Sequence, residues 1–358
     1  MADSINIASS LGDYTVNWCH PSDEAYRAIF QQCRAAIVDK SVWDIYGRDP
    51  NTFGAINNLI IQEAREDLKT LETCISLCEQ LLSSGFRRGE YLLAIGGGII
   101  QDVATLTASV LFRGIPWIYV PTTLLAQADS CIGGKSSINL KQWKNQIGNF
   151  YPPKQIFIVP DYLKSLPEVE LRSGLGEVLK VHLLAGPAMV QQIYDAAPHL
   201  LDDPAVMAQA VHRALMHKAQ IIEDDEFDQG HRLILNYGHT FGHALEAATK
   251  FAVAHGVAVT LGADIANYVA WQLGHIQEQD YALMHEPLRR NLRPSDWVNF
   301  DHTDFFTALR QDKKNRPGQY CFILPVAVGA VERKYLPMAE ETEQIIVRYF
   351  RGVTTWLQ

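Results

Sequence analysis

The sequence predicts two folded parts, an α/β domain over residues 1–160 and a mainly α-helical domain over residues 161–358. In the first part a short apolar stretch at 91–98 is followed by helical periodicity at 99–112 and by another apolar stretch at 116–123. Strand–helix–strand alternation implies a parallel sheet flanked by helices. From about residue 162 helical patterns dominate, and strand signals stay sparse until 320–329. We therefore place the domain boundary near residue 160.

Local patterns predict the individual elements. Residues 35–42 are typical of a strand running into a turn, and the amphipathic stretch 66–85 predicts a helix that ends at a glycine. Three stretches in the second part have helical spacing: 166–185, 205–226 and 241–250. No internal repeat or low-complexity segment interrupts the pattern.

Composition excludes several classes of protein. Hydrophobic residues make up 47% of the 358 residues, and charged residues 20%, which is typical of a globular protein. A net charge of -9 argues against a nucleic-acid surface but leaves room for a local basic pocket. The six cysteines are scattered and predict reduced thiols, and no basic leader or membrane-length apolar run is present. We expect a cytoplasmic protein.

A glycine turn marks a candidate nucleotide site. Gly96, Gly97 and Gly98 follow an apolar strand and open a predicted helix that carries Asp102. Glycines let the backbone approach a pyrophosphate, and the helix N-terminus offers N–H groups. The spacing is not GxGxxG, so a plain tight turn is the competing interpretation. The hydroxyls of Thr122 and Thr123, at the end of the next strand, favour nucleotide binding.

The densest chemical signal lies between residues 232 and 255. His239 and His243 are four residues apart and share a helical face, and His255 follows twelve residues later. The alternative is that these are ordinary structural histidines. Glu177 and Lys180 likewise share a face, as a surface ion pair would. One glutamate and two or three histidines suit zinc, and spacing alone favours His239 and His243 as ligands with His255 as a third.

Basic and polar residues could form an anion pocket. The segment 129–153 contains Gly-Gly-Lys135, but Asp129 stands where a Walker P-loop needs its first glycine, which argues against a Walker-type NTPase. Solvated surface charge is the ordinary role of most lysines. If they converge, the dispersed residues could hold a phosphate and a carboxylate on one small substrate: Arg113, Lys135, Asn145, Lys180, Lys218, Arg232, Lys313 and Lys314.

Taken together, these blocks resemble the 3-dehydroquinate synthase family and its sugar phosphate cyclase relatives. The resemblance runs in order from about residue 60 to residue 330. It is carried by GGGIIQD, FRGIPWIYVPTTLLAQADSCIGGKSSIN, KNQIGNFYPP, LPEVELRSGLGEVLK, RLILNYGHTFGHA, the HG at 255–256 and RQDKK. It implies an N-terminal α/β domain that binds NAD, a helical C-terminal domain that binds metal and substrate, and a homodimer.

The resemblance also implies a role for each site residue. Zn²⁺ or Co²⁺ would be bound by Glu177, His239 and His255, which replaces the choice made from spacing. His243 would instead face the substrate. Substrate phosphate would be bound by Lys135, Asn145, Asn236, His243 and one of Lys313 and Lys314, with Arg113 supplied by the partner subunit. Lys218 and Arg232 would hold the substrate carboxylate, and Asp129 and Lys180 would contact its hydroxyls. NAD contacts would come from Gly97, Gly98, Asp102, Thr122, Thr123, Glu66 and Lys69, together with Asp39 and Glu170.

The implied reaction converts 3-deoxy-D-arabino-heptulosonate 7-phosphate into 3-dehydroquinate, a step of aromatic amino acid biosynthesis. A hydride passes to NAD, phosphate is eliminated, the hydride returns, and an intramolecular aldol reaction closes the carbocycle. The departing phosphate carries about two negative charges, which accounts for a cluster of cations. The substrate phosphate can itself act as the base.

Three departures from the usual family pattern leave the substrate open. Val257 replaces the acid of a usual HGE motif, Gln101 replaces a glycine before Asp102, and Ala-Arg-Glu66 replaces a usual DGE. They favour a relative from secondary metabolism, whereas the intact pair Lys218 and Arg232 favours a substrate with a carboxylate. The alternatives are a cyclase of an amino-heptulosonate, sedoheptulose 7-phosphate or glucose 6-phosphate, a metal-dependent polyol dehydrogenase, and a binding protein without activity.

Overall fold

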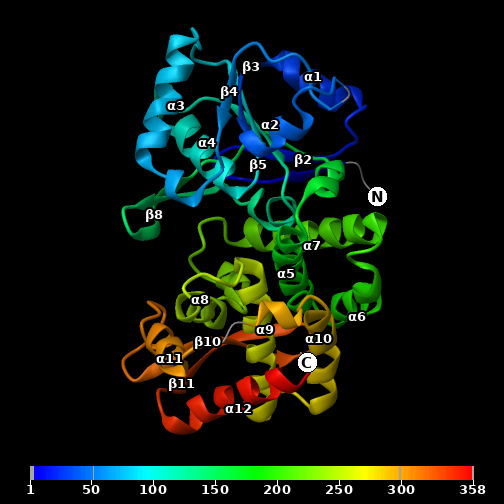
Figure 1. Ribbon diagram of the computed structural model, residues 1–358, viewed down its shortest axis with the longest axis vertical. Helices are drawn as coiled ribbons and strands as arrows, with labels where there is room; N and C mark the ends of the chain where they lie inside the picture. Colours follow the sequence, from blue (N-terminus) through cyan, green and yellow to red (C-terminus); the bar gives the residue numbers. More distant parts are fainter. Residues whose placement is uncertain (1–3, 51, 298–299, 357–358) are drawn as a thin grey trace. The chain divides into compact units, whose positions relative to one another are not determined.

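The computed structural model describes residues 4–50, 52–297 and 300–356. The chain divides into two compact units (Figure 1). The first is Met1–Leu166 with Ala219–Phe227, and the second is Pro167–Lys218 with Asp228–Gln358. The predicted α/β part and mainly helical part are both present. The division lies slightly beyond residue 160, and the stretch 219–227 joins the first unit although it follows helical residues of the second.

A seven-stranded sheet forms the centre of the first unit. Its strand order is β1-β2-β9-β6-β5-β3-β4, and every neighbouring pair is parallel except β1 with β2. The strands are β1 (Ser4–Ile7), β2 (Tyr14–Trp18), β3 (Cys33–Asp39), β4 (Leu59–Gln62), β5 (Tyr91–Gly96), β6 (Trp117–Pro121) and β9 (Gln155–Ile158). The parallel sheet predicted from the alternating pattern is thus confirmed.

Helices cover both faces of this sheet (Figure 1). Successive strand residues point to opposite faces, so the continuous apolar runs of the central strands can be buried on both sides. Val38, Ile95 and Val120 pack in one core cluster with Phe30 and other residues of the first helices. In Figure 1, α1 (Glu24–Gln32) and α2 (Lys40–Tyr46) lie on one side of the strands, and α3 (Leu71–Ser83) and α4 (Gly98–Val110) lie on the other.

The strand order reverses between β3 and β5. From β3 the chain continues outward to β4, whereas from β5 it continues the other way to β6. In open parallel sheets the carboxyl ends of the strands on either side of such a reversal leave a crevice that binds ligands. Asp39 ends β3 and Gly96 ends β5. The topology therefore brings the glycine turn to the favoured position for a nucleotide.

One local feature of the first unit differs from the sequence-based expectation, and another was not predicted. The helix expected at 66–85 begins only at Leu71, because Glu66–Leu68 form a 3₁₀ turn and the Thr70 hydroxyl caps α3 by accepting from the Thr73 N–H. The polar, glycine-rich segment after residue 129 contains an antiparallel hairpin, β7 (Lys135–Leu140) with β8 (Trp143–Phe150).

The second unit is mainly helical, as predicted, and it contains an antiparallel hairpin, β10 (Gln319–Ala327) with β11 (Ala330–Pro337). Its helices are α5 (Glu168–Leu183), α6 (Pro187–Ala196), α7 (Pro204–Asp224, whose last residues belong to the first unit), α8 (His239–Ala248), α9 (His255–Gln272), α10 (Glu278–Arg290), α11 (His302–Arg310) and α12 (Glu340–Trp356). Within the described ranges, no helix has the length and apolar character needed to cross a membrane.

Candidate functional site

Three helices of the second unit bring a carboxylate and two imidazoles together. Oε1 of Glu177 on α5 lies 3.5 Å from Nε2 of His239 on α8 and 3.4 Å from Nε2 of His255 on α9. One potential ligand atom from each residue lies within 4.8 Å of the others. The second oxygen of Glu177 lies 2.5 Å from Nζ of Lys180, and both side chains are buried. Glu177 and Lys180 therefore do not form the exposed ion pair that their spacing alone would suggest.

Glycines allow these helices to approach so closely. A Cβ at Gly256 would lie 1.7 Å from the carbonyl oxygen of Ser173, and one at Gly176 would lie 2.0 Å from the carbonyl oxygen of Gly256. At the crossing of α8 and α9, a Cβ at Gly262 would lie 2.0 Å from the carbonyl oxygen of Gly238. Gly238 has φ +79°, a conformation that other residues rarely adopt. Backbone contact at both crossings thus sets the distances within the cluster.

Burial and charge set the protonation states of the cluster. Burial would raise the pKa of Glu177, but Lys180, His239 and His255 outweigh it and hold that pKa well below its usual range. Burial lowers the pKa of His239 to about 3, with Glu177 opposing. Burial would also lower the pKa of His255, but hydrogen bonds to Glu177 and Glu246 raise it to about 10. The cluster therefore contains a carboxylate and a neutral His239, both of which are competent to bind a divalent cation, whereas His255 must release the proton on Nε2 when a cation binds there.

Each of the two histidines has an acceptor on its other ring nitrogen. Nδ1 of His239 lies 3.3 Å from the carbonyl oxygen of Tyr237, and Nδ1 of His255 lies 3.2 Å from Oε1 of Glu246. A nitrogen that donates to such an acceptor leaves the lone pair on the opposite nitrogen, Nε2, which here is the atom nearest Glu177. Sequence reasoning missed Glu246; its position three residues after His243 was the available signal.

The His243 ring lies beside the cluster and makes no contact with Glu177 among those recorded for the described residues. Its centroid is 5.4 Å from that of His239 and 5.9 Å from that of His255. The His243 side chain is exposed, but nearby protein atoms partly shield its ring from water. This desolvation and nearby Lys314 lower the pKa of His243, with Glu246 opposing. His243, Glu246 and His255 form a second group with potential ligand atoms close together.

The other predicted residues of the second unit are dispersed over several elements. Lys218 and Arg232 are buried cations, at 5% and 3% exposure. The Asn236 side chain donates to the carbonyl oxygen of Leu233. Lys313 is exposed, whereas Lys314 is partly buried beside Asp312 and close enough to His243 to affect its pKa. Glu170 lies in the first turn of α5 and is exposed.

In the first unit the glycine turn opens α4 without a side-chain cap at Gly97. The nearest neighbour of a Cβ built at Gly98 would be Oγ of Ser130, at 3.8 Å, so the N-terminus of the helix is only lightly covered there. Thr122 donates its N–H to the carbonyl oxygen of Gly96, which joins the end of β6 to the turn. The hydroxyl of Thr123 accepts from the N–H of Ala126. Free N–H groups at a helix N-terminus suit a pyrophosphate.

Glu66 and Lys69, two of the predicted NAD contacts, join the hairpin of β7 and β8 in one polar network. Lys69 is buried, and its Nζ donates to Asp102 at 3.0 Å and to Oδ1 of Asn145 at 2.6 Å. Asn139 donates to Glu66 at 2.8 Å and accepts from the N–H of Asn145 at 2.9 Å. Burial raises the pKa of Asp102, with Lys69 opposing. The structure thus joins Asn145, predicted to contact phosphate, to three residues predicted to contact NAD.

Other predicted residues of the first unit are fixed by their own neighbours. Asp39 caps α2 by accepting from the N–H and hydroxyl of Ser41. Arg113 is exposed and has φ +65°, in the left-handed region. Asp129 lies in a short π-helical segment, Ala126–Ser130. The next residue, Ser130, exchanges two hydrogen bonds of 2.6 Å with the side chain of buried Gln101.

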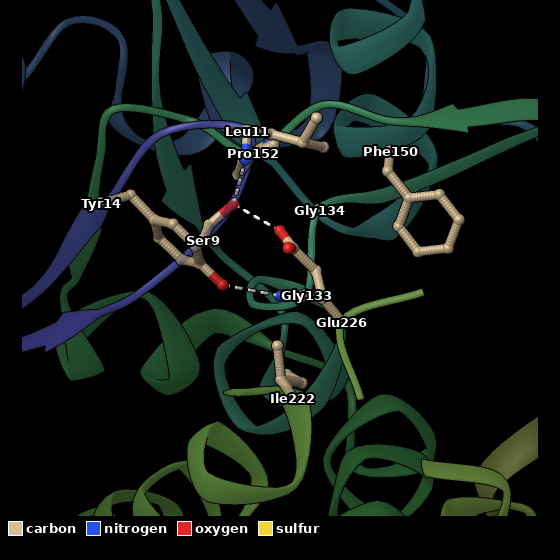
Figure 2. Close-up of a pocket in the computed structure, with 9 residues that line it drawn as sticks. All are labelled: Ser9, Leu11, Tyr14, Gly133, Gly134, Phe150, Pro152, Ile222 and Glu226. Carbon is tan, nitrogen blue, oxygen red and sulfur yellow. Dashed lines mark hydrogen bonds between the residues drawn. The ribbon is translucent and has the colours of Figure 1, made fainter. Parts of the chain in front are cut away.

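The turn that leads into Lys135 is fastened by the first residue of β2. Figure 2 shows the hydroxyl of Tyr14 directed at the backbone of Gly133, whose N–H it accepts at 2.9 Å. Gly133 and Gly134 have φ +93° and +63°, so the turn requires glycine at both positions. On the other side of a small hollow, Glu226 accepts from the hydroxyl of Ser9 (Figure 2). The contact between Glu226 and Ser9 ties the segment 219–227 to the rest of the first unit.

Comparison with known proteins decides the family. Residues 59–173 match the family described as 3-dehydroquinate synthase N-terminal, and residues 174–315 match 3-dehydroquinate synthase C-terminal. The 3-dehydroquinate synthase of Alkaliphilus metalliredigens (strain QYMF) is 38% identical over 308 residues, covering 85% of this chain and 86% of the relative. The chain belongs to the 3-dehydroquinate synthase family. The enzyme of that name from Campylobacter curvus (strain 525.92) is 37% identical over 270 residues, 75% of this chain and 77% of the relative.

Solved structures show the same fold. A 2-deoxy-scyllo-inosose synthase complexed with carbaglucose-6-phosphate, NAD⁺ and Co²⁺ aligns with a TM-score of 0.82 at 24% identity, covering 96% of this chain and 99% of that one. The 2-epi-5-epi-valiolone synthase of Streptomyces hygroscopicus subsp. jinggangensis 5008, with NAD⁺ and Zn²⁺ bound, also gives 0.82, at 23% identity and 97% and 98% coverage. Glycerol dehydrogenase of Schizosaccharomyces pombe gives 0.61, at 17% identity and 95% and 90% coverage. The family fold predicted from the sequence is confirmed.

Proposed function

We propose that the protein is a sugar phosphate cyclase that uses NAD and a divalent metal, zinc or cobalt, and converts 3-deoxy-D-arabino-heptulosonate 7-phosphate into 3-dehydroquinate. The observation that carries the proposal is the buried cluster of Glu177, His239 and His255 with Lys180 beside it, in a chain that is similar to 3-dehydroquinate synthases over most of its length. One structural relative was solved with NAD⁺ and Co²⁺, and another with NAD⁺ and Zn²⁺.

The cluster fits a metal ion by its spacing. Two ligands at the zinc–nitrogen and zinc–oxygen distances of about 2.0–2.1 Å, held at a tetrahedral angle, lie roughly 3.3 Å apart. Oε1 of Glu177 is 3.5 Å and 3.4 Å from the two imidazole nitrogens. One glutamate and two histidines leave a fourth position open, as catalytic zinc sites do. When bound, the metal would polarise a substrate hydroxyl as a Lewis acid.

The first unit fits NAD at the reversal of strand order. The uncapped start of α4 at Gly97 and Gly98 would hold the pyrophosphate, with Thr122 and Thr123 at the end of the neighbouring strand. Lys69 and Asp102, together with Glu66, would line the rest of the site. Asp39 and Glu170 belong to the proposal as further NAD contacts. When bound, NAD would accept a hydride from the ring carbinol and return it later in the same turnover.

Charged side chains would orient the substrate around these groups. Lys218 and Arg232 would hold its carboxylate, and Asp129 and Lys180 would contact its hydroxyls. Burial strengthens such contacts because little water competes for them. Lys218 and Arg232 are both buried, at 5% and 3% exposure, where a charge-assisted contact with a substrate carboxylate is strengthened. This supports a heptulosonate as the substrate.

The departing phosphate would be held by cations and amides: Lys135, Asn145, Asn236, His243 and Lys314. Of the two adjacent lysines, Lys314 is the better candidate because it acts on the pKa of His243 and Lys313 is exposed. A His243 with a lowered pKa is neutral near pH 7, so its ring can donate one hydrogen bond and accept another. It can therefore pass a proton between phosphate and solvent, while the phosphate itself acts as the base.

We further propose a homodimer in which Arg113 of one copy reaches the phosphate held by the other. A mixing experiment tests it: Arg113→Ala and His239→Ala, each inactive alone, are exchanged into mixed dimers at equal ratio. About a quarter of the sites would then be intact, because one site of each mixed dimer carries neither substitution. Recovery of no activity, with mixed dimers verified by mass, would contradict a shared site.

One observation favours a second candidate, a cyclase of a sugar phosphate without a carboxylate. Gln101 and Val257, two of the three departures from the usual family pattern, are both buried, so they change the interior near the proposed sites. A polyol dehydrogenase has no comparable support, since the resemblance to glycerol dehydrogenase at 17% identity concerns the fold alone.

A substrate panel separates these candidates. Purified protein with NAD and Zn²⁺ or Co²⁺ is offered 3-deoxy-D-arabino-heptulosonate 7-phosphate, sedoheptulose 7-phosphate and glucose 6-phosphate, and free phosphate and carbocycle are measured. We expect phosphate release from the heptulosonate without net NADH. Phosphate release from sedoheptulose 7-phosphate alone would contradict the assignment, and stoichiometric NADH without phosphate would indicate a dehydrogenase.

Matched variants test the carboxylate contact. Replacing Arg232 with Gln removes a charge-assisted hydrogen bond worth about 1.5–3 kcal/mol, so kcat/KM for the heptulosonate should fall roughly 10- to 100-fold. Arg88→Gln, at an exposed arginine of the first unit, should leave it unchanged. Equal losses for substrates with and without a carboxylate would show that Arg232 does not bind this group.

A further inference from the structure

His255 lies between two carboxylates from different helices. Its Nε2 is 3.4 Å from Oε1 of Glu177 on α5, and its Nδ1 is 3.2 Å from Oε1 of Glu246 on α8. The side chain of Glu246 is only 14% exposed, so water competes weakly for this contact. The other proposed ligand, His239, has a neutral carbonyl oxygen at its Nδ1 instead. The two histidines therefore differ in the charge of the acceptor behind them.

The two nitrogens of an imidazole have different roles at a metal site. One must donate its lone pair to the metal, and the other then carries the ring proton. A carboxylate that accepts this proton's hydrogen bond fixes the orientation and tautomer of the ring and raises its basicity. With Nδ1–H directed at Glu246, the Nε2 lone pair of His255 is directed at the side of the ring on which Glu177 lies.

The residue two positions after His255 cannot provide this hydrogen bond. Position 257, where the usual family motif has an acid, holds Val257, a buried residue at 2% exposure. An apolar side chain accepts no hydrogen bond. The only carboxylate recorded within hydrogen-bond distance of Nδ1, among the residues that the structure describes, comes from Glu246 in the neighbouring helix.

We propose that Glu246 is a positioning residue for the metal site: it accepts the hydrogen bond from Nδ1–H of His255 and thereby holds Nε2 ready to bind a divalent cation together with Glu177 and His239. This inference rests on the proposed metal-dependent function. It assigns the second group of close ligand atoms, His243, Glu246 and His255, to support of one metal rather than to a second ion. A neutral His255 keeps one ring proton and has only one lone pair to give.

Metal binding to the apoprotein tests the proposal without any assay of activity. Metal is removed with a chelator, and Co²⁺ is titrated in while its d–d absorption is followed, with Zn²⁺ competition to obtain affinities. Glu246→Gln keeps a neutral acceptor, whereas Glu246→Leu removes the acceptor altogether. We expect one Co²⁺ per chain in the unsubstituted protein, about 10-fold weaker binding in Glu246→Gln and about 100-fold weaker binding in Glu246→Leu.

Controls separate this inference from the metal site itself. Glu332→Gln, at an exposed glutamate of β11, should bind like the unsubstituted protein. In a His255→Ala background, Glu246→Gln should cause no further loss, because the residue that Glu246 positions is gone. Circular dichroism of each apoprotein checks folding; if Glu246→Leu does not fold, Glu246→Gln and the double variant still decide the question.

Three outcomes would overturn the idea. Unchanged affinity in Glu246→Gln and Glu246→Leu, while His239→Ala loses the metal, would leave the metal site intact and remove the role of Glu246. Two Co²⁺ ions per chain, of which Glu246→Leu loses one, would make Glu246 a ligand of a second ion. Undiminished binding in both His239→Ala and Glu177→Ala would refute the metal site, and the inference with it.

Discussion

Replacing Gly256 with alanine should loosen the metal site through the helix crossing alone. The added Cβ would lie 1.7 Å from the carbonyl oxygen of Ser173, whereas ordinary contacts begin at 3.4 Å. Helices α5 and α9 must therefore separate by about 1.7 Å or distort, at a cost of about 1–3 kcal/mol typical of overpacking. If they separate, Glu177 and His255 move from 3.4 Å toward about 5 Å, beyond the roughly 3.3 Å that one tetrahedral ion can span.

The assay compares thermal unfolding and Co²⁺ affinity in Gly256→Ala and in a matched control, Gly352→Ala. The control glycine lies in α12 with nothing within 4 Å of an added Cβ, so alanine should stabilise the helix by up to about 1 kcal/mol. For Gly256→Ala we expect a Tm lower by about 2–4 °C per kcal/mol and metal binding at least about 10-fold weaker. A Gly256→Ala protein with the original Tm and affinity would refute the argument that this crossing sets the ligand spacing.

Two further predictions concern contacts away from the metal. Gln101→Gly removes two 2.6 Å hydrogen bonds to Ser130 and places glycine inside α4. Chemical denaturation should therefore show a free energy of unfolding lower by about 1–3 kcal/mol. An unchanged free energy of unfolding would mean that the hydrogen bonds with Ser130 are not stabilising. Burial would lower the pKa of His285, but the buried carboxylate of Asp264, 2.9 Å away, raises it. The ion pair should then stabilise the protein fully below the ordinary histidine pKa of about 6.5 and lose its effect as pH rises through the raised folded pKa. Relative to His285→Gln, the advantage of the unsubstituted protein, about 3–5 kcal/mol at pH 6, should shrink toward pH 9, and a constant or growing difference would contradict the assignment.

Much of the fold could be predicted because its signals are local. The apolar strand before the glycine turn and the helical spacing after it are visible in the chain, and β5 and α4 lie where they were expected. The hairpin of β7 and β8 was not predicted, because a polar, glycine-rich stretch has the composition of a loop. The start of α3 was predicted too early because the helical periodicity of the sequence extends back into Glu66–Leu68. In the structure those residues form a 3₁₀ turn, and the cap at Thr70 makes Leu71 the first residue of α3.

In the candidate site too, some features could be predicted from the sequence and others only from the tertiary structure. The sequence by itself determined which residues are chemically able to act, and the resemblance to the family singled out Glu177, His239 and His255. Spacing alone favoured His239 and His243 as ligands, with His255 as a third, because two histidines four residues apart share a helical face whatever the rest of the fold does. Only the tertiary structure places His255 beside Glu177, and only it sets Glu246 behind His255. Helix crossings decide these contacts, and a crossing depends on glycine-to-backbone packing between segments distant in the chain, which no local pattern reports.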